Sequence, residues 1–236
     1  MGYHRAGFEV VGVDIKHQPR YPFPDGFVQA DALQFLSDLI GNGQIQDFDC
    51  IHASPPCQAH TAMKTMWNAK EHRDFIGETR ELLRASGLPY VIENVEGAPL
   101  EYPTLLCGTM FNLGCEGAEL RRHRIFETSF FCFAPECRHG QSSVIGIYGG
   151  HARNRTRTIG IYGEGARDSR RKLDKGVPDF NVNDAKKALD IDWMTLAEMC
   201  QAIPPAYTSY IGAQLLAVVS RSAAVRRRPL RGLGRK

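Results

Sequence analysis

Short apolar runs rich in β-branched residues alternate with longer amphipathic stretches along the first two-thirds of the chain. The runs at 9–15, 48–53, 90–95 and 123–128 are predicted strands, and the stretches at 30–40 and 72–86 are predicted helices. The second helix should stop at Ser86, because Gly87 and then Pro89 follow it. Each helix is long enough to connect two parallel strands. The pattern therefore predicts an α/β fold with a doubly wound sheet, in which ligands bind at the carboxyl ends of the strands.

The composition changes over residues 130–190, which are rich in Gly, Arg, Asn and aromatic residues and show no sustained hydrophobic periodicity. This segment is predicted to be an inserted lobe rather than core. Within it, Ile-Gly-Ile-Tyr-Gly at 145–149 recurs at 159–163, which suggests a short hairpin pair. Regular structure is predicted to resume where Thr195 and Glu198 fit a capping box, and the apolar segment 206–219 should form a last helix. We expect residues 220–236 to be a basic, disordered tail.

The composition is that of a globular protein. Of the 236 residues, 43% are hydrophobic and 23% charged, which suffices for one full-sized core. No apolar run is long enough to span a membrane, and the N-terminus lacks the apolar stretch of a signal peptide. The seven cysteines are odd in number and widely spaced, so we expect reduced thiols. A cytoplasmic monomer without membrane contact is expected.

The net charge of +3 is unevenly distributed. Residues 151–175 contain eight lysines and arginines against three acids, and residues 226–236 are basic without any acid. Clustered basic side chains bind nucleic acid by displacing its condensed counterions, so we expect phosphate contacts there. The alternative is a solvated loop and a solvated tail.

One cysteine stands in a context that favours chemistry. Ser54-Pro55-Pro56-Cys57-Gln58 directly follows a predicted strand, and the two prolines stiffen the turn that presents the thiol at the carboxyl edge of the sheet. A thiolate is a strong nucleophile when a turn offers it backbone N–H groups. A cysteine taken alone would more often be a core residue, but this context favours a nucleophile.

Several segments occur in an order that resembles the DNA (cytosine-5)-methyltransferases. Pro55-Pro56-Cys57-Gln58 resembles the catalytic loop of that family, Glu93-Asn94-Val95 its Glu-Asn-Val signature, and Arg122-His123-Arg124 its Gln-x-Arg-x-Arg segment, with Leu120 where the glutamine is usual. Residues 195–207 and 211–215 resemble its C-terminal segments. The resemblance implies a Rossmann-like methyltransferase sheet with a small inserted target-recognition lobe. It divides the chain into a catalytic domain (1–129 and 191–219), the lobe (130–190) and the tail (220–236).

The resemblance also implies an activity. Such an enzyme transfers a methyl group from S-adenosylmethionine to carbon 5 of cytosine in double-stranded DNA, as in restriction-modification systems of bacterial or phage-infected cells. Cys57 would attack carbon 6 of a base flipped out of the duplex. Glu93 would contact ring N3 and the exocyclic amine, and Arg124, or Arg122 beside it, would hold the carbonyl oxygen.

Only some of the family's cofactor contacts have counterparts in this sequence. Asp14 with Ile15 would hold the ribose, and Asp31 with Ala32 the adenine, while Pro55 would lie beside the methyl donor. Either aspartate could instead be an ordinary cap. Family members begin with a strand and a Phe-x-Gly-x-Gly loop, whereas this sequence starts at a segment resembling the helix after that loop. Either the start lies at an internal Met, or a second chain supplies the strand, or the chain no longer methylates. We expect weak binding of S-adenosylmethionine.

The lobe at 130–190 takes the place of the family's target-recognition domain, so its arginines are candidates for phosphate or guanine contacts. The DNA-binding candidates are Gln58, Arg153, Arg155, Arg157, Arg170 and Arg171. Cys132, Cys137 and His139, with Cys115 or His151 as a fourth ligand, are candidates for a structural zinc site. Their spacing is irregular for zinc, so we expect no metal.

Two other functions are alternatives to the methyltransferase. The first is a catalytically silent DNA-binding remnant, in which the arginine-rich lobe persists beside a broken cofactor site. The second is a cysteine hydrolase that uses Cys57, but no matching His or Asn motif accompanies it.

Overall fold

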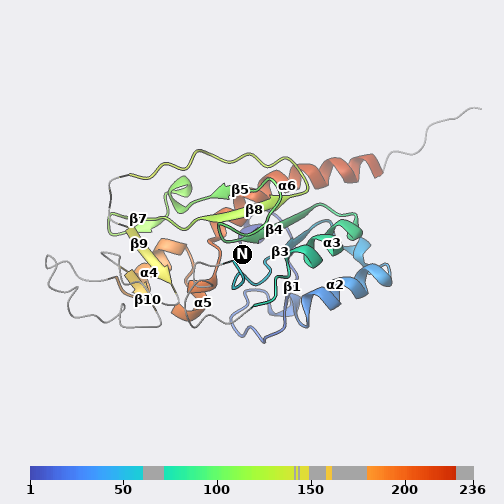
Figure 1. Cartoon of the computed structure of the whole chain (residues 1–236), viewed down its shortest axis with the longest axis horizontal. Helices are drawn as coiled ribbons and strands as arrows, with labels where there is room; N and C mark the ends of the chain where they lie inside the picture. The colour runs from blue at the N-terminus through green and yellow to red at the C-terminus, as the bar shows by residue number, and fades with distance from the viewer. Residues whose placement is uncertain (61–71, 141, 143, 149–157, 161–179, 227–236) are drawn as a thin grey trace, which may run out of the picture.

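The structure is a computed structural model that describes residues 1–60, 72–140, 142, 144–148, 158–160 and 180–226. These residues form a mixed α/β protein with three open sheets (Figure 1). Within the described ranges, no helix combines the length and the apolar character that crossing a membrane requires.

The central sheet has the strand order β3-β4-β8-β5, with β3 at Ile51–Ala53, β4 at Tyr90–Asn94, β8 at Arg124–Thr128 and β5 at Thr104–Leu106. β3 and β4 run parallel, whereas β8 is antiparallel to both of its neighbours. The sheet is therefore mixed, and not the parallel doubly wound sheet that the sequence pattern predicted. A parallel return needs a crossover helix, and residues 95–123 hold only short strands and the 3-10 turn η4 at Gly108–Phe111.

Two helices cover the β3–β4 half of this sheet, as the sequence predicted. α2 spans Ala32–Gly41 and α3 spans Ile76–Ser86, and both contribute to one core with Tyr90 and Ile92 of β4. α3 ends at Gly87, whose φ of 68° is a left-handed conformation that favours glycine. Every residue of β4 is buried, which makes it the strand best suited to hold a desolvated functional group.

A second, two-stranded sheet lies at the N-terminal end of the chain. β1 at Gly12–Asp14 pairs parallel with β2 at Phe27–Gln29, and η1 at Pro24–Gly26 precedes β2. Among the described residues, β1 pairs only with β2, and β3 only with β4. Val11 and Ile15 flank β1 and are 43% and 64% exposed. Within the described part of the chain, β1 and β3 thus each have one edge without a strand partner.

The third sheet has the order β10-β9-β7-β6, from β10 at Thr158–Gly160, β9 at Val144–Tyr148, β7 at Ala118–Leu120 and β6 at Gly114–Cys115. It shares a buried core with α4 at Val182–Leu189, including Leu120, Ile147 and Leu189. The described residues of the two Ile-Gly-Ile-Tyr-Gly copies, 145–148 and 159–160, lie on neighbouring strands that pair parallel, so these strands do not form the expected hairpin. β6 and β7 precede residue 130, so the sheet of this region begins earlier in the chain than the lobe that we expected.

The described part of the chain ends in two helices. Thr195 and Glu198 form the predicted capping box of α5 at Leu196–Gln201. α6 at Pro205–Arg226 packs Tyr207 and Ile211 against the central sheet, and it lies along α1 at Gly2–Arg5. α6 extends to Arg226, so residues 220–226 are helical and not part of a disordered tail (Figure 1).

Candidate active site

The loop that carries Cys57 follows directly from β3. Pro55 and Pro56 restrict the backbone of this loop, and the carbonyl oxygen of Cys57 accepts a hydrogen bond of 2.9 Å from the N–H of His60. The side-chain amide of Asn94, at the end of β4, donates to the carbonyl of Pro55 at 3.0 Å. The partly buried Cys57 is thus held in a turn that is anchored to the neighbouring strand.

Glu93 lies on β4 beside this loop and is only 6% exposed. Its Oε1 is 3.0 Å from Nε of Arg124, the first residue of β8. Burial raises the pKa of the Glu93 carboxyl, while the charge of Arg124, a hydrogen bond to Ser54 and the charge of Arg122 oppose the rise. A buried carboxyl with a raised pKa can either accept or donate a proton, which suits a catalytic group.

A chain of hydrogen bonds leads from the N-terminal helix to Glu93. The Tyr3 hydroxyl lies 2.7 Å from Nδ1 of His52, Nε2 of His52 lies 3.0 Å from the Ser54 hydroxyl, and Ser54 bonds to Glu93. Burial lowers the pKa of His52 to about 4, so the imidazole is neutral and carries one N–H. With Tyr3 donating to Nδ1, His52 donates to Ser54, and Ser54 donates to Glu93.

Arg122 and Arg124 have different surroundings, although only one residue separates them. Arg124 contacts Glu93, whereas Arg122 is 4% exposed and donates to the carbonyl oxygens of Ile147 and Cys200 at 3.0 and 2.7 Å. Those carbonyls belong to β9 and α5. Arg122 therefore joins the central sheet to the third sheet, and Arg124 is the arginine that faces the candidate catalytic acid.

The cofactor candidates lie mostly at one end of the β1–β2 sheet. Asp14 ends β1 and accepts hydrogen bonds from the N–H of Lys16 and from Gln18. Asp31 is the N-cap of α2, and its Oδ1 accepts from two backbone N–H groups of the first turn. Ile15 is exposed beside Asp14, Ala32 opens α2, and Pro55 lies on the Cys57 loop. Both aspartates thus have the capping role that the sequence left open.

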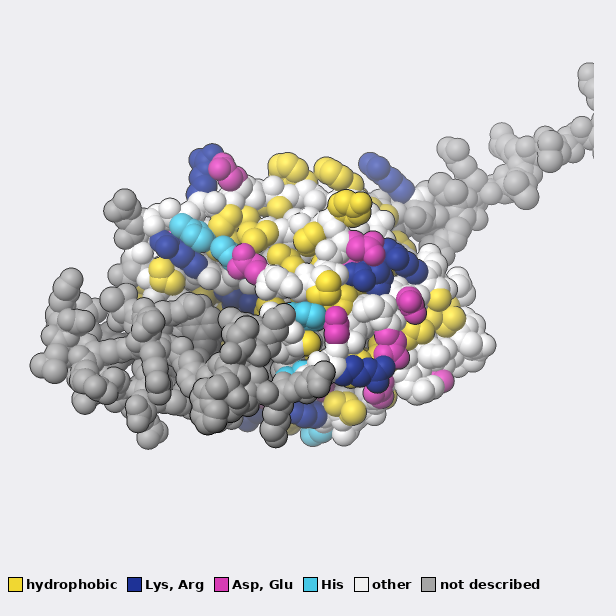
Figure 2. Space-filling view, in the orientation of Figure 1, with side chains coloured by type: hydrophobic (Ala, Val, Ile, Leu, Met, Phe, Trp, Pro, Cys, Tyr) yellow, Lys and Arg dark blue, Asp and Glu magenta, His cyan; other side chains and the backbone are white. Residues whose placement is uncertain are grey.

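Of the DNA-binding candidates, only Gln58 lies within the described residues. Gln58 is exposed next to Cys57, whereas Arg153, Arg155, Arg157, Arg170 and Arg171 lie outside the described residues. On the face in Figure 2, described basic side chains lie beside acidic ones. Arg80 bonds to Glu127 and Arg84 to Glu101 at 2.7 Å, for example.

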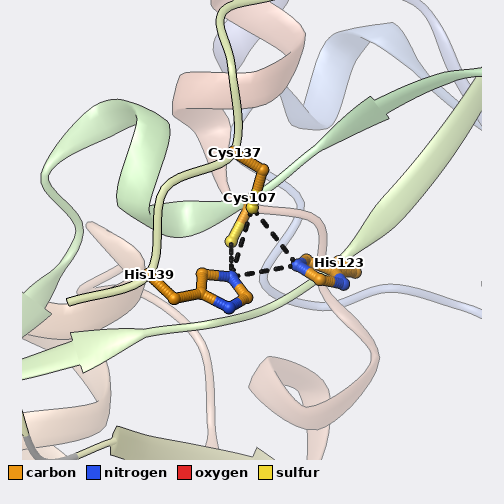
Figure 3. Close-up of side chains that lie close together, drawn as sticks. All are labelled: Cys107, His123, Cys137 and His139. Carbon is orange, nitrogen blue, oxygen red and sulfur yellow. Dashed lines mark hydrogen bonds between the residues drawn. The ribbon is translucent and has the colours of Figure 1, made fainter. Parts of the chain in front are cut away.

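A group of cysteines and histidines, of which the sequence predicted only Cys137 and His139, lies beside β8. Cys107 and His123 converge on Cys137 and His139, while Cys132 and Cys115 do not belong to this group (Figure 3). His151 lies outside the described residues. The pairing of β5 with β8 brings Cys107 and His123 together, and only a correct prediction of that pairing could have found them.

Neither a scan of protein-family models nor a search of the curated proteins finds a match to this chain.

Proposed function

We propose that this chain is a Rossmann-like DNA (cytosine-5)-methyltransferase that acts through a covalent bond between Cys57 and the base. The observation that supports this best is the ion pair of the buried Glu93 with Arg124, 3.0 Å apart and tied through Ser54 to the loop of Cys57. A nucleophile, a carboxyl of raised pKa and a cation in one place can together activate an electron-poor ring.

The chemistry follows from the weak nucleophilicity of carbon 5 in an aromatic cytosine. When the Cys57 thiolate bonds to carbon 6, the ring loses its aromaticity and electron density moves to carbon 5. Carbon 5 can then form a bond to an electrophile. Loss of the carbon 5 proton to a base and departure of the thiolate restore the aromatic ring and the enzyme.

Glu93 and Arg124 would stabilise the charge that builds up during the attack. Protonated Glu93 would donate to ring N3, and its second oxygen would accept from the exocyclic amine. Arg124 would hold the carbonyl oxygen at position 2. Glu93 is buried and Arg124 is partly buried, so water would compete only weakly with the contact between Glu93 and the ring. The base could reach them only after flipping out of double-stranded DNA.

S-adenosylmethionine, when bound, would supply the electrophilic methyl group. Asp14 with Ile15 and Asp31 with Ala32 would hold its nucleoside part, and Pro55 would border it on the Cys57 side. These residues fit only in part, because both aspartates already accept hydrogen bonds from their own turns. Among the described residues, β1 and β3 also each have one edge without a strand partner, so we expect weak cofactor binding.

The edges of β1 and β3 that have no strand partner among the described residues favour a second function, DNA binding without catalysis. Val11 and Ile15, which flank β1, are exposed. A chain that does not bind the methyl donor would bind DNA without methylating it. The two functions differ in whether Cys57 can still attack cytosine.

The deciding experiment measures that attack without any methyl donor. A reversible bond from Cys57 to carbon 6 allows carbon 5 to exchange its hydrogen with water, so DNA labelled with tritium at carbon 5 of cytosine should release tritium. We expect release by the wild-type chain, none by Cys57→Ser, and unchanged release by the control Cys132→Ser. DNA containing 5-fluorocytosine should give a covalent adduct at Cys57 when S-adenosylmethionine is added. If wild-type and Cys57→Ser chains bind DNA equally and neither releases tritium, the DNA-binding function is correct.

A further inference from the structure

Four potential metal ligands from three parts of the chain meet beside the start of β8 (Figure 3). Cys107 follows β5, His123 directly precedes β8, and Cys137 and His139 lie in the segment after β8. One sulfur or ring nitrogen from each residue lies within 4.8 Å of all the others. The β5–β8 pairing, which places Leu106 opposite Arg124, sets Cys107 and His123 side by side.

The distances between these atoms fit a tetrahedron around one metal ion. Zinc bonds of about 2.3 Å to sulfur and about 2.0 Å to nitrogen imply tetrahedral edges of about 3.5 Å between sulfur and nitrogen, and about 3.3 Å between two nitrogens. Cys137 Sγ lies 3.2 Å from His139 Nε2 and 3.5 Å from His123 Nε2. Cys107 Sγ lies 3.4 Å from His139 Nε2, and the two histidine nitrogens are 3.2 Å apart.

Hydrogen bonding alone cannot satisfy this group. His139 Nε2 has three neighbours within 3.4 Å, namely both sulfurs and His123 Nε2. A ring nitrogen offers either one N–H or one lone pair, so it cannot bond well to all three. A cation at the centre accepts one lone pair from every member, which explains why all four atoms point to one place.

The surroundings also suit a metal. Glu96 lies 2.9 Å from Nδ1 of His123, which is the carboxylate–histidine pairing that orients zinc ligands. The Thr109 hydroxyl donates to Cys107 Sγ at 3.3 Å. Two thiolates balance the charge of one divalent cation, so the fully buried Cys107 would carry no uncompensated charge.

We propose that Cys107, His123, Cys137 and His139 form a structural zinc site that fastens the segment 130–140 to the β5–β8 end of the central sheet. Two sulfurs and two nitrogens in a closed tetrahedron are typical of structural zinc. His123 stands between Arg122 and Arg124, so the metal would also fix the start of β8. The inference does not depend on the proposed methyltransferase activity.

The test is a metal analysis of the purified full chain, expressed with zinc and passed through gel filtration. We expect about one zinc per chain in the wild type, and a loss of most of it in Cys137→Ser and in His139→Ala. Cys132→Ser and Cys115→Ser are the matched controls, because these cysteines lie outside the cluster, and they should keep the zinc. Cobalt(II) substitution should give the visible bands of a tetrahedral site with a sulfur-to-cobalt charge-transfer band.

A finer test uses Glu96→Gln, which leaves all four ligands in place. It should still bind one equivalent at saturating zinc, but with about 10-fold lower affinity, because the carboxylate no longer orients His123. The proposal is overturned if the folded wild-type chain takes up no zinc or cobalt at micromolar concentrations. It is also overturned if Cys137→Ser retains as much zinc as Cys132→Ser, or if Cys107 and Cys137 are joined by a disulfide in the native protein.

Discussion

Glu93 on β4 and Arg124 on β8 form an ion pair of 3.0 Å inside the central sheet, where Glu93 is almost completely shielded from water. Burial still raises the pKa of Glu93 in spite of this partner. The pair therefore holds a carboxyl that can exchange a proton, directly beside the loop of Cys57.

Changing Glu93 to Gln should separate catalysis from binding. The amide keeps the shape of the side chain but cannot supply a proton to ring N3, so tritium release from labelled DNA should fall by about 100-fold or more. DNA affinity, measured by a mobility shift, should change less than threefold, since proton transfer takes no part in binding. Equal losses in both measurements would mean that Glu93 is merely structural.

The two arginines should give different phenotypes. Arg122→Ala leaves the carbonyls of Ile147 and Cys200 without their buried donor, so we expect the free energy of unfolding to drop by about 2 to 4 kcal/mol. Arg138→Ala is the surface control, because that side chain is 82% exposed and should change stability by less than about 0.5 kcal/mol. Urea denaturation measures both. A stable Arg122→Ala chain would rule out the joining role that we assign to Arg122.

His52 predicts a loss of stability in acid. Its pKa is lowered to about 4 in the folded chain and is about 6.5 when unfolded, so between these values the unfolded chain binds a proton that the folded chain does not. Stability should thus fall as the pH drops from 6.5 towards 4, with His52 contributing about 3 kcal/mol of that fall.

Other carboxylates titrate in the same range, so the test compares variants. His52→Gln should show a shallower loss than the wild type in urea denaturations at pH 7, 5.5 and 4. His17→Gln, at an exposed histidine, should follow the wild type. A His52→Gln curve parallel to the wild type would mean that His52 titrates normally.

The Tyr3 hydroxyl should act through His52 and Ser54 and not on the base itself. Tyr3→Phe removes the donor to His52 Nδ1 and weakens the hydrogen bonds that lead to Glu93. We expect tritium release to fall several-fold, with its pH profile shifted, because Glu93 loses part of the network that supports its charge. Tyr210→Phe, on the last helix, is a matched control that should leave the pH profile unchanged.

The main strands and helices of the central sheet could be predicted from the sequence because each depends on neighbours along the chain, whereas the short strands β2, β5, β6 and β7 and the helix α4 were not predicted. The apolar run of β4, Gly87 after α3, and the Thr195–Glu198 box are local signals, and each appears where it was expected. The sequence likewise predicted that Cys57 follows one strand and that Glu93 lies near the end of another, but the adjacency of these strands is known only from the structure. The predicted features need only periodicity and turn chemistry.

Tertiary structure decided which distant residues meet. Whether Arg122 or Arg124 faces Glu93 depends on how β8 sits beside β4, and the choice of Cys107 and His123 as partners of Cys137 depends on the pairing of β5 with β8. The echoed Ile-Gly-Ile-Tyr-Gly segments likewise predicted two strands but not their parallel pairing. A sequence fixes the chemistry of each side chain and the local path of the backbone, whereas contacts between distant segments arise only when the whole sheet forms.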